Sequence, residues 1–260
     1  MEPIEHVEFL SRSEHRISVL RHLRESGPTT KREFREELSA SRSTVTRSLS
    51  ALEERGWITS NSDTYELTPA GRGITDQYLD LTDAVELTEE LSPILELVSA
   101  SELDFDIEHL SDATVTESTD SDPYAPVRKH MAAFEEAQSI RSVLPSVDLE
   151  VAQTFRDRLE DPGFSGVLVV TAEIAHRFAQ PEYEAVVNDM LDAENCDILV
   201  SEEDFPYYLG ILEGETVQIG IEDGQGYPRA LLETDDVAVY EWAMDEFDRY
   251  RERASPMEDV

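Results

Sequence analysis

The chain has 260 residues, and its 58 acidic and 21 basic side chains give a formal net charge of -37 at pH 7. This length predicts two domains, each long enough to bury a core, and such an acid excess ordinarily argues against nucleic acid as a partner. The single cysteine, Cys196, excludes an internal disulfide and fits a reducing cytoplasm. No apolar run approaches about 18 residues and the acidic start does not resemble a signal peptide, so we expect a cytoplasmic protein with no membrane partner.

The acidic charge is unevenly divided along the chain. Residues 1–72 hold 11 Lys or Arg against 12 Asp or Glu, whereas residues 73–260 hold 10 against 46. Lysine is scarce, since only Lys31 and Lys129 occur. Acid excess with few lysines resembles the proteins of haloarchaea, whose cytoplasm holds molar salt, and at about 1 M ionic strength the Debye length is about 3 Å. We therefore interpret the acidic runs as solvated surface and not as a metal site, and the N-terminal part stays compatible with nucleic acid.

Three helices are predicted at the start of the chain. The first begins at Ser13 and is ended by Gly27-Pro28. Helices over residues 30–38 and 42–52 follow, joined by the turn 39–41. Two amphipathic helices joined by a short turn and followed by a β-hairpin are typical of a winged helix-turn-helix. Binding to double-stranded operator DNA is therefore the first functional hypothesis, and a helical hairpin of an ordinary small α domain is the alternative.

The helix over residues 42–52 has one apolar face and one polar face. Val45, Leu49 and Leu52 fall at i, i+4 and i+7, which leaves the hydroxyls and arginines on the other faces. Arg can bind guanine bidentately in the major groove, while Ser and Thr contact bases or phosphates. The predicted contacts of this helix are Arg42, Ser43, Thr44, Thr46, Arg47 and Ser50, with Lys31 and Arg32 of the preceding helix on phosphate.

A wing is predicted after these helices. Residues 57–59 are expected to pair with residues 65–67 across the turn-forming residues 60–64. The wing residues Asn61, Ser62 and Thr64 are expected near the minor groove or the DNA backbone. Thr68 then caps a new helix that has Pro69 at its first position.

A long helix is predicted from Pro69 to about Leu91. Its apolar stripe, Ile74, Tyr78, Leu81 and Val85, could pack onto its own domain or onto a second subunit, and we favour a homodimer. The predicted division is a winged helix-turn-helix domain over residues 1–72, linking or dimerisation helices over 73–110, and an effector-sensing or dimerisation domain over 111–260.

The C-terminal part alternates strands and helices. A short strand is expected at 113–116, helices at 124–138, 147–159 and 181–193, strands at 139–144, 166–171 and 197–200, then a meander of strands at 207–212, 216–221 and 229–232, and a closing helix from Asp236. Cys196 is expected to be buried in a strand. The predicted fold class is α+β: an N-terminal winged helix-turn-helix, a linking long helix, and a C-terminal α/β domain with a mixed sheet, parallel in its first half and antiparallel at its end.

Several C-terminal segments accompany the winged helix. They are residues 140–145, 205–212 and 221–226, and residues 232–236 before Glu241-Trp242. In this combination almost the whole chain resembles archaeal winged-helix regulators that carry a methanogenesis-regulator-type middle domain. The resemblance implies a DNA-binding transcription regulator whose C-terminal domain senses a ligand or mediates dimerisation, and it implies neither a particular ligand nor a pathway.

No catalytic residue, cofactor or metal ligand is predicted. The sequence has no His-x-Lys, His-Glu-x-x-His or phosphate-loop motif, and residues 224–226 are more typical of a hairpin turn than of a dinucleotide site. A small-molecule effector would bind where strands end in an open α/β sheet. The candidates there are Arg141, Thr171, Glu173, His176, Ser201, Glu202 and Tyr207, with His176 expected near the end of a buried strand. The alternative function is a protein-interaction adaptor that does not bind DNA and recruits a basic partner through its acidic surface.

Overall fold

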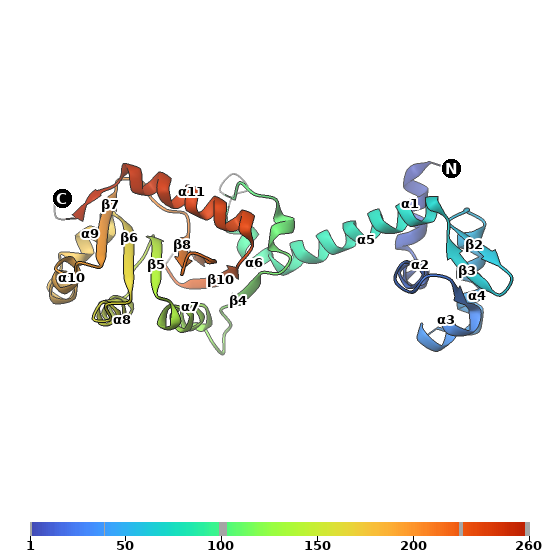
Figure 1. Cartoon of the computed structure of the whole chain (residues 1–260), viewed down its shortest axis with the longest axis horizontal. Helices are drawn as coiled ribbons and strands as arrows, with labels where there is room; N and C mark the ends of the chain where they lie inside the picture. Colours follow the sequence, from blue (N-terminus) through green and yellow to red (C-terminus); the bar gives the residue numbers. More distant parts are fainter. Residues whose placement is uncertain (1, 39, 99–102, 224–225, 258–260) are drawn as a thin grey trace. The chain divides into compact units, whose positions relative to one another are not determined.

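The computed structural model describes residues 2–38, 40–98, 103–223 and 226–257. It divides into two compact units, Met1–Glu86 and Leu87–Val260, called unit 1 and unit 2 below. Figure 1 shows the elements of both units. The three-part division expected from the sequence stays a prediction. No helix in the described residues is both long and apolar enough to cross a membrane.

Unit 1 combines helices with a small antiparallel sheet. Its elements are α1 Pro3–Ser11, α2 Glu14–Ser26, β1 Thr29–Thr30, α3 Lys31–Glu37, α4 Arg42–Glu53, β2 Ile58–Asn61 and β3 Thr64–Leu67, followed by α5 Pro69–Glu90. The order α2, α3, α4 and hairpin agrees with the winged-helix order predicted from the sequence. The helix α1 was not predicted, although Pro3 in its first turn and Glu5 in its capping box favour a helix start there.

The core of unit 1 joins the helices to the hairpin. Leu20 of α2, Phe34 of α3 and Leu52 of α4 are at most 1 % exposed, and each such side chain contributes about 1.5 to 3 kcal/mol by leaving water. The predicted apolar face of α4 is confirmed, because Val45 and Leu49 lie in the same core. Burial of this face turns the polar face of α4 toward solvent.

The hairpin turn is tighter than predicted. β2 and β3 pair from Ile58 opposite Leu67 to Asn61 opposite Thr64, so the turn contains only Ser62 and Asp63. Ser62 has a φ of 58°, the left-handed conformation that two-residue hairpin turns require. The sequence placed the turn at residues 60–64 because those residues are polar, but β2 is exposed along most of its length and tolerates polar side chains.

The helix α5 spans residues 69 to 90, as predicted. Thr68 Oγ1 accepts a hydrogen bond from the Gly71 amide at 3.0 Å and caps its first turn. The stripe on this helix is divided between two environments. Tyr78 packs against the core of unit 1 and its hydroxyl lies 3.2 Å from Ser11 Oγ. The other three members are exposed: Ile74 (37 %), Leu81 (54 %) and Val85 (52 %).

Unit 2 contains one mixed sheet. Within the part of the chain that the structure describes it has eight strands, in the order β11-β7-β6-β5-β8-β9-β10-β4. The strands are β4 Thr114–Glu117, β5 Ser139–Leu144, β6 Ser165–Thr171, β7 Cys196–Ser201, β8 Tyr208–Leu212, β9 Thr216–Glu222, β10 Pro228–Thr234 and β11 Ser255–Pro256. β5, β6 and β7 run parallel to one another, whereas the pairings among β5, β8, β9, β10 and β4 are antiparallel. The predicted mixed sheet is therefore confirmed.

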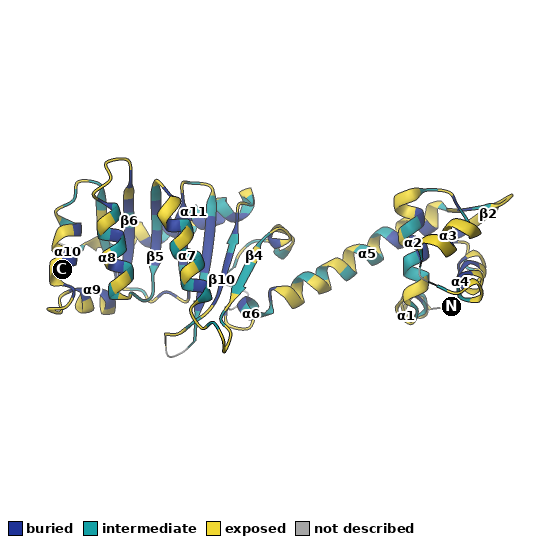
Figure 2. Ribbon diagram, turned by 90° about the horizontal axis from the view of Figure 1, so that it is seen from below, coloured by how far each residue is buried: buried dark blue, intermediate teal, exposed yellow. Residues whose placement is uncertain are grey.

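Helices cover both faces of this sheet. One face carries α7 Ala125–Glu136, α8 Leu149–Arg158, α9 Ala172–Phe178 and α10 Glu184–Leu191. The other carries α6 Ser92–Leu95, the 3-10 helix η1 Ile107–Leu110 and α11 Val237–Arg253. Figure 2 shows buried strands under helices whose outer sides are exposed. Each face thus has its own hydrophobic core.

Some predictions for the chain differ from the structure or cannot be compared with it. Residues 172–178 form the helix α9 directly after β6, because Thr171 both ends the strand and caps the helix, its Oγ1 accepting from the Ile174 amide at 3.2 Å. Cys196 begins β7 and is half-buried, and burial raises the pKa of its thiol to about 12. Ser39, in the predicted helix-helix turn, and Gly224 and Gln225, in the predicted hairpin turn, lie outside the described residues.

Candidate nucleic-acid interface

An open hollow of about 710 Å³ lies over the first part of α4. The residues that line it, Ser41, Arg42, Ser43, Thr46, Arg47 and Ser50, are all exposed. The sequence predicted five of these six as DNA contacts. It missed Ser41, although a serine directly before a predicted helix is a recognisable N-cap signal.

The first turn of α4 is held by hydroxyl groups. Ser41 Oγ accepts a hydrogen bond from the Thr44 amide at 3.2 Å and lies 2.9 Å from Thr44 Oγ1. The Ser43 hydroxyl lies 2.8 Å from the same Ser41 oxygen. Thr44 is half-buried and engaged at this cap, so the structure places it outside the lining of the hollow, unlike the other predicted contacts on α4.

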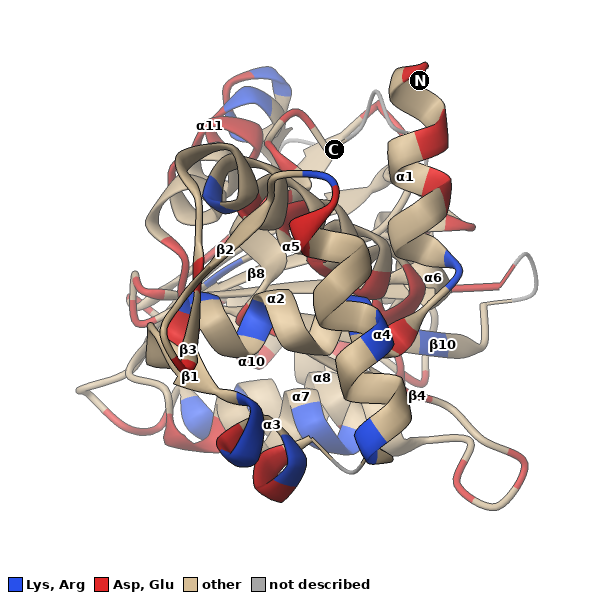
Figure 3. Ribbon diagram, turned by 90° about the vertical axis from the view of Figure 1, so that its right-hand side faces the viewer, with Lys and Arg blue, Asp and Glu red and all other residues tan. Residues whose placement is uncertain are grey.

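The arginines of the hollow have no carboxylate partner. Arg42 and Arg47 are exposed, and within the described ranges neither has an Asp or Glu oxygen within 4.0 Å. Within the described residues, 8 of the 21 Lys and Arg side chains form ion pairs with carboxylates, and Arg42 and Arg47 are not among them. Figure 3 shows Lys or Arg positions on both α3 and α4. Unpaired guanidinium groups keep their hydrogen-bond donors available for base edges or phosphates.

The two predicted phosphate contacts of α3 differ in their surroundings. The Lys31 ammonium lies 5.3 Å from the centre of the Tyr65 ring, a cation-π contact that leaves its donors free of carboxylates. Arg32 forms an ion pair with Glu36, with Nε to Oε1 at 2.8 Å, and this contact raises the pKa of Arg32. Lys31 is therefore the better candidate of the two for a phosphate contact.

The β2–β3 hairpin, predicted to be a wing, places Asn61, Ser62 and Thr64 around its tip. Thr64 Oγ1 donates a hydrogen bond to the Asn61 carbonyl at 3.1 Å, which uses its proton within the hairpin. The tip also carries Asp63 and has no Lys or Arg. A carboxylate repels phosphate, so this wing is less suited to the DNA backbone than the start of α4.

Two of the predicted effector residues have local hydrogen-bond partners in the structure. Thr171 and Ser201 lie opposite each other at the ends of β6 and β7, but both hydroxyls accept backbone hydrogen bonds, from Ile174 and from Glu203 respectively. Their positions at strand ends are accounted for by local capping.

The other candidates lie on different elements. Arg141 lies within β5 with Nη1 3.8 Å from Met244 Sδ, and Tyr207 is buried with its ring 6.2 Å from that of Trp242. Glu202 is exposed after β7. Glu173 and His176 are exposed on α9, so the expected strand-end position of His176 was wrong; its Nδ1 lies 2.6 Å from the Ala172 carbonyl.

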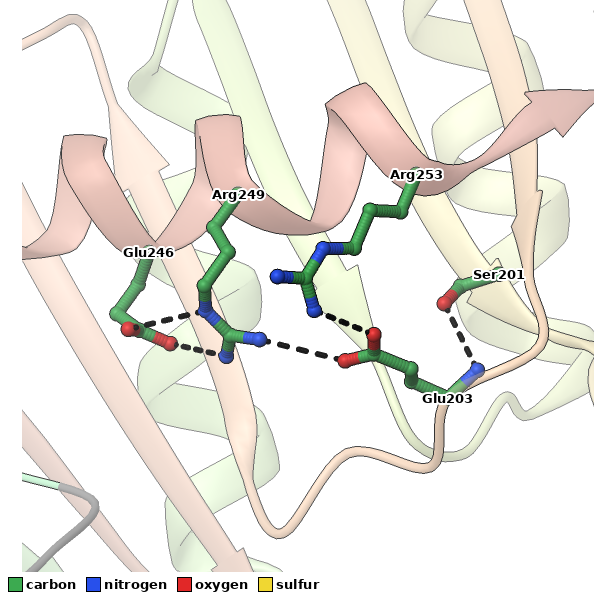
Figure 4. A network of polar contacts seen from close by, with 5 residues as sticks. All are labelled: Ser201, Glu203, Glu246, Arg249 and Arg253. Carbon is green, nitrogen blue, oxygen red and sulfur yellow. Dashed lines mark hydrogen bonds and ion pairs between the residues drawn. The ribbon is translucent and has the colours of Figure 1, made fainter.

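Polar residues of α11 form a network that the sequence did not indicate (Figure 4). Glu203 binds Arg253 at 2.7 Å and Arg249 at 3.3 Å, and Arg249 binds Glu246 at 2.6 Å. The hydrogen bond with Arg253 makes the largest contribution to lowering the pKa of Glu203, and the contact with Arg249 lowers it further. The network ties the segment after β7 to α11, beside Ser201.

A second polar network lies between α7 and the antiparallel half of the sheet. His130 Nδ1 lies 2.8 Å from Gln218 Oε1, and Gln218 Nε2 donates to Glu233 at 2.7 Å, which also binds Lys129 at 2.8 Å. Gln218 is fully buried, and burial lowers the pKa of His130. The ring of Tyr208 lies against His130, with ring centres 5.0 Å apart. Such a network positions α7 on the sheet.

Two family models match the chain. The HVO_A0261 N-terminal domain matches residues 4–90, and the middle domain of the methanogenesis regulatory protein FilR1 matches residues 123–253. These matches confirm the resemblance inferred from the sequence. A comparison with curated proteins found no match.

Solved structures resemble the chain only loosely. The archaeal chromatin protein TrmBL2, described as showing a novel mode of DNA binding, is 15 % identical with a TM-score of 0.44, covering 94 % of this chain and 99 % of that one. NucT from Helicobacter pylori is 11 % identical with a TM-score of 0.45, covering 55 % and 98 %. The phospholipase D family member Nuc from Salmonella typhimurium is 14 % identical with a TM-score of 0.40, covering 55 % and 97 %.

Proposed function

The chain belongs to the family defined by the middle domain of the methanogenesis regulatory protein FilR1, and from that premise we propose that it is a cytoplasmic transcription regulator that binds double-stranded DNA through α4. The observation that carries the proposal is the hollow over α4, with its exposed hydroxyls and unpaired arginines. An α-helix fits the major groove, where Arg binds guanine bidentately and Ser or Thr contacts bases or phosphates. Lys31 binds a phosphate beside it.

High salt suits this way of binding. Salt weakens the sequence-independent attraction between cations and phosphates, because that attraction comes from released counterions. In molar salt the direct hydrogen bonds to base edges carry a larger share of the affinity. Two unpaired arginines among hydroxyl groups supply such bonds without a large basic surface. Unit 1 has no such surface, since positions 1–72 hold 11 basic and 12 acidic residues.

The test is selection of binding sites from a random pool of duplex DNA in molar KCl, followed by titration of the selected duplex. Arg47→Gln should weaken binding and broaden the selected sequence. Arg251→Gln, which makes the same charge change on α11, serves as the matched control and should bind as the wild type does. Failure to enrich any sequence, with capture of a basic protein partner instead, would favour the adaptor function.

We further propose that the regulator is a homodimer held together by α5. Leu81 and Val85 are more than half exposed, and with Ile74 and Tyr78 they repeat with the 4-3-4 spacing of a coiled-coil seam. At about 100° per residue Asp76, Asp80, Asp83, Glu86 and Glu90 lie on other faces, whereas Glu89, four residues after Val85, lies at the end of the seam. The seam from Ile74 to Val85 is itself uncharged, and molar salt screens the repulsion between two chains of charge -37.

Light scattering in molar KCl tests the dimer. We expect about twice the chain mass of 29.4 kDa, and a monomer for Leu81→Glu. Arg72→Glu, on the opposite face of α5, is the control and should stay a dimer. A wild-type monomer at micromolar concentration would contradict this assembly, as would a folded Leu81→Glu dimer.

Unit 2 is proposed to sense a small molecule and thereby change DNA affinity. The support is its family membership and its mixed α/β fold beside a DNA-binding unit. A ligand acts only through different affinities for the binding and non-binding states, typically by about 1 to 3 kcal/mol. A thermal-shift screen of cytoplasmic metabolites on the full chain, followed by DNA titration with each hit, tests this role. Hits that stabilise the protein but leave DNA affinity unchanged would argue against a sensor.

A further inference from the structure

A second hollow of about 440 Å³ lies in unit 1, away from the candidate DNA-binding face. Its lining residues come from α1, from the region of α2 and from just beyond α4: Glu5, Glu8, Phe9, Arg12, Arg16 and Arg55. The first hollow runs along α4 from Ser41 to Ser50, whereas Arg55 lies beyond the C-terminal end of that helix. The two hollows have no lining residue in common.

Two arginines of this hollow stack on one aromatic ring. The guanidinium carbon of Arg16 lies 3.8 Å from the centre of the Phe9 ring, and that of Arg55 lies 3.3 Å from it. Within the described residues neither arginine forms an ion pair with a carboxylate. The pKa of Arg16 is lowered by burial and by the nearby charge of Arg55. Both guanidinium groups thus contact the same ring, and Arg16 Nη1 also donates a hydrogen bond to the Phe9 carbonyl.

The carboxylates of the hollow have partners other than Arg16 and Arg55. Glu8 binds Arg12 at 2.9 Å, and Glu5 accepts a hydrogen bond from the Glu2 amide at 2.9 Å at the start of α1. Arg55 Nη1 donates to the Ala51 carbonyl at 3.1 Å, but its Nε is buried without a partner. A buried donor without a partner costs about 1 to 3 kcal/mol, which an incoming acceptor would recover.

We propose that Arg16 and Arg55 form a binding site for the phosphate or carboxylate group of a small anionic molecule. Guanidinium groups match such oxyanions in charge and in planar hydrogen-bond geometry. An oxyanion would also relieve the repulsion between the two arginines and satisfy the buried donor of Arg55. The site lies on the DNA-binding unit itself and at the far end of α4, so it is separate from any effector site on unit 2.

Trp57 provides a direct readout. Its ring centre lies 5.8 Å from that of Phe9, the residue on which both arginines stack. The chain has one other tryptophan, Trp242, which belongs to unit 2. In a Trp242→Phe background, tryptophan fluorescence therefore comes from Trp57 alone, which contacts Phe9 beside this hollow.

The experiment titrates the full chain with potassium phosphate and, separately, with potassium malonate, with KCl keeping the ionic strength constant and molar. We expect a saturable change in Trp57 fluorescence that is weakened at least tenfold in Arg16→Gln and in Arg55→Gln. Arg47→Gln, at a position that does not line this hollow, should respond like the parent. A response to phosphate alone indicates that the site binds phosphorylated ligands, and a response to malonate alone indicates carboxylates. A response to both indicates a general oxyanion site.

Several outcomes would overturn the proposal. One is a response to neither anion beyond that to KCl, and another is a response unchanged in both glutamine variants. A third is a loss of DNA affinity in these variants without added anion, together with a flatter salt dependence, because the arginines would then contact the DNA backbone. If either glutamine variant lacks the native circular dichroism spectrum, Arg16→Lys and Arg55→Lys keep the charge and remove the planar fork, and they should also weaken binding.

Discussion

Two helices, one in each unit, carry pairs of arginines whose surroundings differ. Arg42 and Arg47 of α4 line an open hollow and have no carboxylate partner in the described part of the chain. Arg249 and Arg253 of α11 both bind Glu203. In a chain with so many carboxylates, an arginine that stays unpaired is available to a ligand, whereas a paired one holds the fold together.

The same contrast applies to hydroxyl groups. Ser43, Thr46 and Ser50 of α4 are exposed around the hollow. Thr171 and Ser201 of the sheet are buried and accept hydrogen bonds from nearby backbone amides. Polar residues at strand ends therefore give weak evidence of a ligand site until their local hydrogen bonds are known.

The largest effect is expected from a substitution that disrupts the packing of α5 against Trp57, in the core that also holds α4. A Cβ on Gly71 would lie 1.7 Å from the Trp57 carbonyl oxygen, a backbone atom that cannot move aside without shifting the hairpin. Gly71→Ala should destabilise unit 1 by about 3 kcal/mol or more and abolish DNA binding. The ion pairs of Arg249 and Arg253 on α11 should be unaffected. Differential scanning calorimetry of the full chain measures this loss.

Gly73→Ala is the matched control on the same helix. A Cβ there has no neighbour within 4 Å, so the substitution should be neutral or stabilise by about 0.4 to 1 kcal/mol. Equal melting curves for the two variants would mean that α5 does not pack on Trp57 as described.

The second prediction compares alanine variants of one arginine from each pair. Arg47→Ala should weaken specific DNA binding by about 1 to 3 kcal/mol and relax the sequence preference at one position, with little change in stability. Arg249→Ala should leave DNA affinity unchanged and lower the stability of unit 2 by about 1 kcal/mol or less, because its ion pairs are partly exposed. Fluorescence anisotropy titrations measure the DNA affinity of both variants, and chemical denaturation measures their stability. Weaker DNA binding by Arg249→Ala would contradict the proposed difference between the two arginine pairs.

Part of this contrast was predictable from the sequence. The spacing of Val45, Leu49 and Leu52 fixed which side of α4 is buried, so the exposed contacts followed from helical periodicity. The strands β6 and β7 were predictable from apolar runs, since parallel strands are covered on both faces.

The partners of the arginines could not be predicted. Glu203 lies 46 residues before Arg249, and only the fold brings them together. Helix α9 was missed because a buried strand and a helix share Thr171 with no loop between them. The effector candidates were chosen by the strand-end rule, which takes no account of hydroxyl groups used in caps.

The third prediction concerns the buried polar network of unit 2 and its dependence on pH. The folded pKa of His130 lies below its ordinary value of 6.5, because burial disfavours the charged ring, and the network that faces it includes Lys129, Tyr208 and Glu233. The unfolded chain therefore binds a proton that the folded chain does not. Stability is complete above about pH 6.5 and is lost as the pH falls toward the folded pKa, by at most about 1.4 kcal/mol per pH unit.

Chemical denaturation between about pH 5 and pH 8 in molar KCl measures this slope. His130→Gln should flatten it, whereas His176→Gln, at an exposed position on α9, should leave it unchanged. A slope that is the same in both variants would mean that another group titrates. DNA contacts on α4 should not depend on this proton, which separates the structural network from the recognition surface.

The smallest effect is expected on α3, where one helix contains both kinds of cation. Lys31 has no ion pair among the described residues and contacts the Tyr65 ring, whereas Arg32 binds Glu36. If Lys31 binds a phosphate, Lys31→Ala should weaken binding to all sequences alike by less than about 1 kcal/mol and reduce the slope of log affinity against log salt by about 1. Arg32→Ala should change both quantities less, because Glu36 already neutralises that charge. DNA titrations over a series of KCl concentrations measure the two slopes. A larger effect of Arg32→Ala than of Lys31→Ala would show that the ion pair opens on DNA, and pairing in the free protein would then no longer distinguish a structural arginine from one that binds a ligand.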